Sequence, residues 1–263
     1  MSLIKDLQFG FSGYGKALEF IFKNRLYYYF LIPLLLNILL FGTTLSFVGE
    51  FTAYSTSYIQ SILNPESWDF FGADILKGTI SFIINLVLYF FFFLLYAFLG
   101  GYIILILLSP VLSVVSEKAE RILYKTDYPF SWAQIIKDSW RGIKLAIRNF
   151  LIESATIILL FLISFVPVIG LATTPILFIV SAYYYGFSFI DYTSERRKLN
   201  SRQSIQFVKQ NKGLAIGNGI PFALTLLIPF VGVSLSGFIA IISTVAATLS
   251  IFQKEQLIEQ YPN

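Results

Sequence analysis

The sequence Phe165-Val166-Pro167-Val168-Ile169-Gly170 divides residues 154–190, a stretch that contains no charged residue. Leu227-Ile228-Pro229-Phe230-Val231-Gly232 divides a second charge-free stretch, residues 213–252, in the same way. Proline removes a backbone donor and clashes with the preceding helical turn, while glycine tolerates positive φ angles. Each stretch is therefore predicted to form a helical hairpin. Two residues mark each tip: Pro167 and Gly170 in the first hairpin, Pro229 and Gly232 in the second.

The depth of these hairpins follows from the lengths of their arms. The first arms, residues 150–166 and 213–228, are 17 and 16 residues long. As helices they would reach about 24 to 26 Å, slightly less than the hydrocarbon core of about 30 Å. We therefore expect hairpins that penetrate only part of the bilayer, with four ordinary tilted spans as the alternative. The tips have almost no polar side chains, which makes them candidates for a protein-lined functional site.

The composition is that of a membrane protein. Hydrophobic residues make up 56% of the chain and charged residues 13%, and the mean hydropathy is +0.73. An ordinary soluble domain has about 25% charged residues. Because lipid admits only helices or closed barrels and no alternating strand pattern recurs, we expect an all-α integral membrane protein. It should form a single membrane domain over residues 1–263 with two long transmembrane helices, two hairpins and amphipathic cytoplasmic helices.

The expected elements follow the hydrophobic pattern along the chain. Residues 2–22 should form an interfacial helix, and residues 26–48 and 80–108 should be the two spans. Pro110 should break or kink the second span, which continues as one long helix to Tyr124. The hairpins should occupy residues 150–190 and 213–252.

The absence of cysteine and histidine excludes several kinds of site. No Cys nucleophile, disulfide, thiolate metal site or histidine general base is available. No Gly-Lys-Ser/Thr phosphate loop occurs either, so nucleotide hydrolysis is not indicated. We expect no cofactor, no metal site, no nucleic-acid partner and no enzymatic activity.

The positions of the 19 Lys and Arg residues predict the orientation. Basic residues precede residue 26, fill residues 117–148 and 196–212, and recur at Lys254, whereas residues 49–79 contain only Lys77. The positive-inside rule therefore places both termini and both basic loops in the cytoplasm. This topology requires each charge-free stretch to return to the side from which it entered, as a hairpin does.

One cytoplasmic segment has basic residues at helical spacing. Lys137, Arg141, Lys144 and Arg148 recur every three or four residues, with Trp140 beside them. A helix that lies along anionic lipid headgroups explains this pattern. A vestibule that gathers anions is the alternative.

Two polar clusters are candidate functional residues. The first cluster lies where the first span begins, either as interfacial anchors or as an oxyanion site formed by helix amides and a guanidinium. Its members are Lys23, Asn24, Arg25, Tyr27, Tyr28 and Tyr29. Glu117, Glu120 and Arg121 follow Pro110, either as a surface ion pair or as a network that lines or gates a pore.

Five short sequence motifs, taken in order along nearly the whole chain, resemble those of the CysZ family. They are Tyr29-Phe30-Leu31-Ile32-Pro33, Leu108-Ser109-Pro110 with Ser116-Glu117-Lys118-Ala119-Glu120, Phe165-Val166-Pro167-Val168-Ile169-Gly170, Ile190-Asp191-Tyr192 with Arg196-Arg197-Lys198-Leu199, and Ile228-Pro229. The resemblance implies a bacterial inner-membrane protein for sulfate uptake in cysteine synthesis. It also implies partly penetrating hairpins and assembly into dimers or larger homo-oligomers.

The resemblance also points to the start of the first span. In the family, a Gly-Leu-Arg-Arg run associated with sulfate binding precedes the Ile-Pro phrase; here the corresponding residues are Arg25, Leu26, Tyr27 and Tyr28. Only the leucine matches, and Arg25 supplies a displaced guanidinium. We expect a channel or transporter for sulfate or a related small oxyanion, without ATP drive. The alternative is a non-transporting membrane scaffold or assembly factor, because the same domain occurs in a eukaryotic stress-induced membrane protein.

Overall fold

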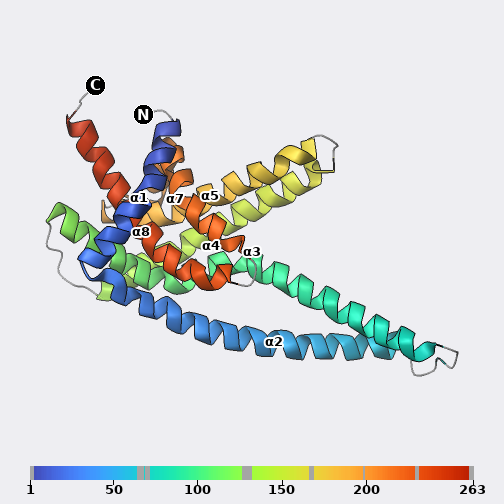
Figure 1. Cartoon of the computed structure of the whole chain (residues 1–263). Helices are drawn as coiled ribbons and strands as arrows, with labels where there is room; N and C mark the ends of the chain where they lie inside the picture. Colours follow the sequence, from blue (N-terminus) through green and yellow to red (C-terminus); the bar gives the residue numbers. More distant parts are fainter. Residues whose placement is uncertain are drawn as a thin grey trace. The chain divides into compact units, whose positions relative to one another are not determined.

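The computed structural model describes residues 3–63, 68, 72–125, 132–165, 169–197, 199–228 and 231–260, and these contain helices and no strand. The helices are α1 (Leu3–Lys23), the 3₁₀ helix η1 (Leu26–Phe30), α2 (Leu31–Leu63), α3 (Ala73–Tyr124), α4 (Trp132–Ile163), α5 (Ile169–Arg196), α6 (Ser201–Gln210), α7 (Lys212–Leu226) and α8 (Gly232–Gln260) (Figure 1). Five segments are long and apolar enough to cross a membrane: Ala73–Phe92, Leu99–Tyr124, Trp132–Ile163, Gly170–Glu195 and Gly232–Leu257. The predicted all-α integral membrane protein is confirmed.

The chain forms two compact units, Met1–Pro33 with Gly101–Asn263 (unit 1) and Leu34–Gly100 (unit 2). In unit 2, the Thr56 hydroxyl of α2 donates to Asn85 Oδ1 of α3 at 2.9 Å. Most of the large apolar side chains described in this unit are exposed. Such a surface is stable against lipid or another protein, not against water. The single domain over residues 1–263 stays a prediction.

Helix α8 forms the core of unit 1. In its candidate span 78% of the residues are buried, against 17% for α4. Its buried positions include small and hydroxyl-bearing side chains such as Ser243, Ala247 and Thr248. Small residues let neighbouring helices approach closely, which is how membrane helices gain packing contacts.

Helix α7 is held between α1 and α5 by glycines. A Cβ on Gly217 would collide with the Leu7 carbonyl oxygen of α1. A Cβ on Gly219 would collide with the Ala182 carbonyl oxygen of α5, and one on Gly186 with the Ala215 carbonyl oxygen of α7. The α5 and α7 backbones are therefore in direct contact, and any larger side chain at these positions would separate them.

The two charge-free stretches each contain a helix break, as predicted. Helix α4 ends at Ile163 before α5 begins at Ile169, and α7 ends at Leu226 before α8 begins at Gly232. Pro167 and Pro229 lie outside the described residues. Helix α7 has 15 residues and so measures about 22 Å. Partial penetration of the bilayer stays a prediction.

The expected reason for the tip glycines is wrong. Neither Gly170 nor Gly232 has a positive φ angle. Instead, a Cβ on Gly170 would collide with the Ser164 carbonyl oxygen, and a Cβ on Gly232 with the Thr225 carbonyl oxygen. Each tip glycine thus lets the second helix start against the end of the first one.

Several predicted boundaries also differ from the structure. The predicted span 26–48 begins as the 3₁₀ helix η1 and continues as α2 to Leu63. Pro33 has no N–H for the Tyr29 carbonyl, which disfavours α-helical bonding in the preceding turn. Helix α3 includes Pro110 without ending there, so the predicted long helix is confirmed and a break at Pro110 is wrong. Helix α4 joins the predicted amphipathic segment and the first hairpin arm into 32 residues.

Candidate oxyanion site

The turn between α1 and η1 presents Arg25. Helix α1 ends where the Asn24 Nδ2 group donates to the Phe20 carbonyl oxygen at 2.8 Å. Arg25 then adopts a left-handed conformation with φ 57°, and the chain continues into η1. Non-glycine residues rarely adopt this conformation, because the Cβ approaches the backbone. The turn exposes Arg25 and buries its neighbour Leu26.

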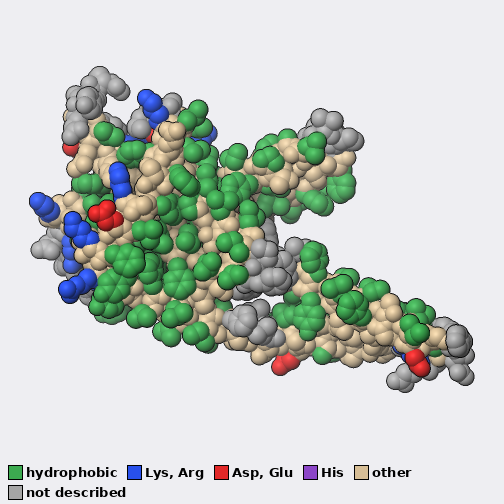
Figure 2. Space-filling model, in the orientation of Figure 1, with side chains coloured by type: hydrophobic (Ala, Val, Ile, Leu, Met, Phe, Trp, Pro, Cys, Tyr) green, Lys and Arg blue, Asp and Glu red, His purple; other side chains and the backbone are tan. Residues whose placement is uncertain are grey.

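A cleft of about 430 Å³ joins this turn to α3. Its lining residues are Asn24, Arg25, Leu26, Tyr28, Tyr29, Lys118, Arg121 and Ile122. We call it the Arg25 cleft. It brings three cationic side chains together from two segments that are far apart in the sequence. Figure 2 shows, on the face in view, Lys and Arg side chains of unit 1 gathered at one side, away from the hydrophobic α4 and α5 arms.

The charges in the Arg25 cleft are only partly balanced. Arg121 Nη2 lies 3.4 Å from Glu117 Oε1, an ordinary pair one helical turn apart. Within the described part of the chain, no carboxylate lies within ion-pair distance of Arg25 or Lys118. The Lys118 ammonium lies 5.2 Å from the centre of the Tyr29 ring. The cleft therefore favours an anion.

Neutral donors complete the lining. The Tyr27 hydroxyl donates to the Tyr28 hydroxyl oxygen at 3.2 Å, so Tyr28 keeps its own proton for another acceptor. Asn24 uses one amide proton for the Phe20 carbonyl oxygen and has a second. A tetrahedral oxyanion can accept several such bonds together with those of a guanidinium and an ammonium.

The structure brings together part of each predicted cluster. Arg121 of the second cluster lines the cleft, and so do Asn24, Arg25, Leu26, Tyr28 and Tyr29 of the first. Lys23 and Tyr27 are not lining residues. Glu117 pairs with Arg121, while Glu120 is buried. The tip residues Gly170 and Gly232 do not line this cleft.

Sequence reasoning missed two lining residues, Lys118 and Ile122. Lys118 precedes Arg121 by three residues, so helical spacing could have placed both cations on one face of α3. It also missed Glu153, a buried carboxylate that accepts hydrogen bonds from Tyr102 and Ser181 and does not line the cleft. Among the described residues, no group of acidic side chains is arranged to hold a metal ion.

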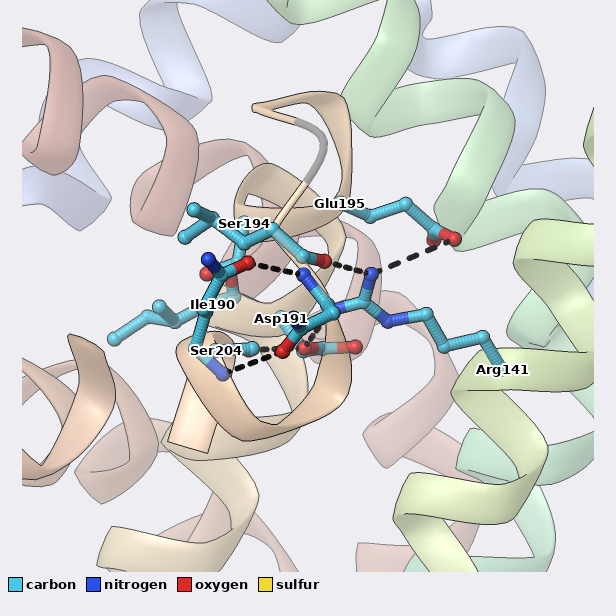
Figure 3. Close-up of polar contacts among 9 residues, drawn as sticks. Arg141, Ile190, Asp191, Ser194, Glu195 and Ser204 are labelled. Carbon is cyan, nitrogen blue, oxygen red and sulfur yellow. Dashed lines mark hydrogen bonds and ion pairs between the residues drawn. The ribbon is translucent and has the colours of Figure 1, made fainter. Parts of the chain in front are cut away.

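A separate polar network joins α4, α5 and α6 (Figure 3). Arg141 donates to Asp191 Oδ1 at 2.8 Å and to the Leu199 carbonyl oxygen at 2.7 Å. Ser204 of α6 donates to the same Asp191 oxygen. These bonds fix the start of α6 against α4.

Comparison with known proteins identifies the family. A family model described as "Sulfate transporter CysZ/Etoposide-induced protein 2.4" matches residues 14–235. The chain belongs to the CysZ/EI24 family. The matched residues include the whole Arg25 cleft and both hairpin breaks.

Three relatives of the CysZ family show how far the similarity extends. The protein named "Sulfate transporter CysZ" of Pseudomonas paraeruginosa is 26% identical over 220 residues, which cover 82% of this chain and 85% of the relative. Its namesake in Pseudomonas fluorescens is 25% identical over 83% of this chain and 84% of the relative. The one in Pseudomonas syringae is 24% identical over 82% of each. The predicted family is confirmed, and the chain is a multi-pass membrane protein of a transporter family.

Proposed function

We propose that this protein transports sulfate, or a related small oxyanion, into the cytoplasm across the bacterial inner membrane. The Arg25 cleft carries this proposal, because Arg25 and Lys118 meet there without a carboxylate partner among the described residues. The CysZ-family relatives are named for sulfate transport. A gradient drives the transport without nucleotide hydrolysis, both termini are cytoplasmic, and the protein acts as a homodimer or larger homo-oligomer.

The chemistry of the cleft suits a sulfate dianion. The Arg25 guanidinium can contact two sulfate oxygens at once, whereas the Lys118 ammonium acts as a compact point charge. The side chains of Arg25, Tyr28 and Lys118 are all exposed. Water therefore screens their charges and keeps the affinity modest. Modest affinity is useful in transport, since a bound ion must also leave.

One observation favours the alternative, a membrane scaffold that transports nothing. Helices α5 and α7 touch at Gly186 and Gly219, which leaves no room for an ion between these two helices. A transport path must therefore run elsewhere in the protein. Ion flux separates the two functions directly.

The test is uptake of labelled sulfate into phosphatidylcholine liposomes that contain the purified protein and no ATP. Uptake should follow the sulfate gradient and fall at least tenfold in Arg25→Ala/Lys118→Ala, which loses two charge-assisted contacts. Lys16→Ala/Lys209→Ala is the matched control, because it removes two exposed positive charges outside the cleft. Absence of protein-dependent uptake at every gradient would contradict transport and favour the scaffold.

A further inference from the structure

Unit 1 has a second basic cleft, on α4 and the first turn of α6. Its volume is about 320 Å³, and its lining residues are Lys137, Trp140, Arg141, Lys144, Leu145, Arg148, Ser201 and Ile205. We call it the Lys144 cleft. It shares no residue with the Arg25 cleft, so the two sites can be tested independently.

The basic residues of the Lys144 cleft form one stripe along α4. At 3.6 residues per turn, Lys137, Arg141, Lys144 and Arg148 fall within an arc of about 60°. Arg141 is occupied by Asp191 and the Leu199 carbonyl oxygen, so it fixes one side of the cleft (Figure 3). Lys137, Lys144 and Arg148 can therefore attract an anionic ligand.

Two of these cations, Lys144 and Arg148, contact neutral side chains. The Lys144 ammonium lies 5.3 Å from the centre of the Trp140 ring. Arg148 donates to Asn149 Oδ1 at 3.0 Å, and its guanidinium carbon lies 5.6 Å from the Phe187 ring centre. Across the ranges the structure describes, no carboxylate is within ion-pair distance of Lys137, Lys144 or Arg148. The cleft therefore concentrates positive charge on one face of a single helix.

The surface that follows the cleft along α4 is apolar. After Arg148 the large apolar side chains that are exposed on α4 are Leu151, Ile158, Leu159, Phe161 and Leu162. Trp140, beside the stripe, is 58% exposed. Exposed tryptophan and basic residues next to an apolar surface are typical of helix segments that lie at the depth of the lipid headgroups. Phosphate groups of lipids are the anions present at that level.

We propose that the Lys144 cleft binds the phosphate group of an anionic phospholipid headgroup. Lys137 and Lys144 contact the phosphate oxygens, and Arg148 contributes charge from the side nearest the membrane core. Trp140 packs beside the headgroup, with its ring next to the Lys144 ammonium. A free phosphate or sulfate ion offers the same oxygens but not the acyl chains that would lie along the apolar part of α4.

Trp140 provides a reporter for this site. The chain has three tryptophans, so Trp68→Phe/Trp132→Phe leaves Trp140 alone. Short-chain phosphatidylglycerol, titrated into this protein in neutral detergent, should change the Trp140 fluorescence saturably. Lys137→Ala/Lys144→Ala should weaken that binding roughly 30-fold, at about fivefold per lysine. Lys137→Arg/Lys144→Arg should restore it, and Lys16→Ala/Lys209→Ala should leave it unchanged.

Two further titrations identify the ligand. Short-chain phosphatidylcholine should bind at least tenfold more weakly than phosphatidylglycerol, and inorganic phosphate or sulfate should give no saturable change at millimolar concentration. Equal binding of both lipids would overturn the proposal, because the surface would then select only apolar chains. Saturable binding of the inorganic ions with the affinity of the lipid would also overturn it, since the cleft would then be a site for soluble anions.

Discussion

The Arg25 cleft and the Lys144 cleft are both basic, but they are built differently. The Arg25 cleft takes its cations from two segments, the turn after α1 and helix α3, and adds tyrosine and asparagine donors. The Lys144 cleft takes all its cations from one stripe of α4, beside an exposed tryptophan and an apolar surface. Donors from several directions suit a free tetrahedral ion, whereas a one-sided stripe suits a phosphate group that the bilayer already holds in place. Positive charge alone therefore does not tell the two functions apart.

The largest expected effect concerns the side of the membrane that both clefts face. The chain has no cysteine, so Lys118→Cys and Lys137→Cys each introduce a single thiol. Neither thiol should react with an impermeant reagent added to intact cells, and both should react after permeabilisation, because both lie in predicted cytoplasmic regions. Glu50→Cys, on the predicted outer side, is the control that should react from outside. Labelling of Lys118→Cys in intact cells would refute the predicted orientation.

The next prediction tests whether the two clefts are independent, by measuring sulfate uptake and lipid binding in a double variant of each cleft. Arg25→Ala/Lys118→Ala should reduce sulfate uptake at least tenfold without changing the phosphatidylglycerol response of Trp140. Lys137→Ala/Lys144→Ala should weaken the phosphatidylglycerol response of Trp140. Its sulfate uptake in phosphatidylcholine liposomes should stay within about twofold of that of the unmodified protein. Size-exclusion profiles identify any variant that fails to fold. If both variants lost both properties, the two clefts would not be independent sites.

A smaller effect concerns the neutral donors that distinguish the Arg25 cleft. Tyr28→Phe removes the hydroxyl whose proton is not used by Tyr27, so sulfate affinity should fall about fivefold. Tyr27→Phe is the matched control, because Tyr27 does not line the cleft and should change affinity less than twofold. Equilibrium binding of labelled sulfate measures both variants. A greater loss in Tyr27→Phe would move the site away from Tyr28.

The smallest effect tests the acidic neighbour of Arg121. Glu117→Gln keeps the shape of the side chain but removes a negative charge 3.4 Å from Arg121 Nη2. Sulfate affinity should rise about threefold, because a partly exposed charge of this kind changes the binding free energy by less than about 1 kcal/mol. The same variant should not affect lipid binding. Weaker sulfate binding would show that Glu117 positions Arg121 more than it competes for it.

The helix breaks were predictable because they depend on local chemistry. Proline, glycine and apolar sequence predict one helix break within residues 150–190 and another within residues 213–252, whichever partners surround them. What surrounds each helix was not predictable in the same way. Helices α4 and α8 are both apolar, yet 17% of the α4 span and 78% of the α8 span are buried. Lipid and a protein core both require apolar side chains, so composition does not distinguish them.

Only the part of the candidate site at the start of the first span was predictable from the sequence. Arg25 and Tyr28 stood out because they replace a family motif at the start of a span. Lys118 became a candidate only when the structure showed α3 beside η1, a contact between segments that are far apart in the sequence. The tip glycines were identified for the wrong reason, since close approach to a carbonyl oxygen depends on packing and not on local φ preference.

Calorimetric titration of sulfate into the purified protein in neutral detergent tests the central claim most directly. The unmodified protein and Lys137→Ala/Lys144→Ala should bind sulfate with the same affinity. Arg25→Ala/Lys118→Ala should bind it at least tenfold more weakly while keeping its size-exclusion profile. An unchanged isotherm in Arg25→Ala/Lys118→Ala would contradict the assignment of the oxyanion site to the Arg25 cleft.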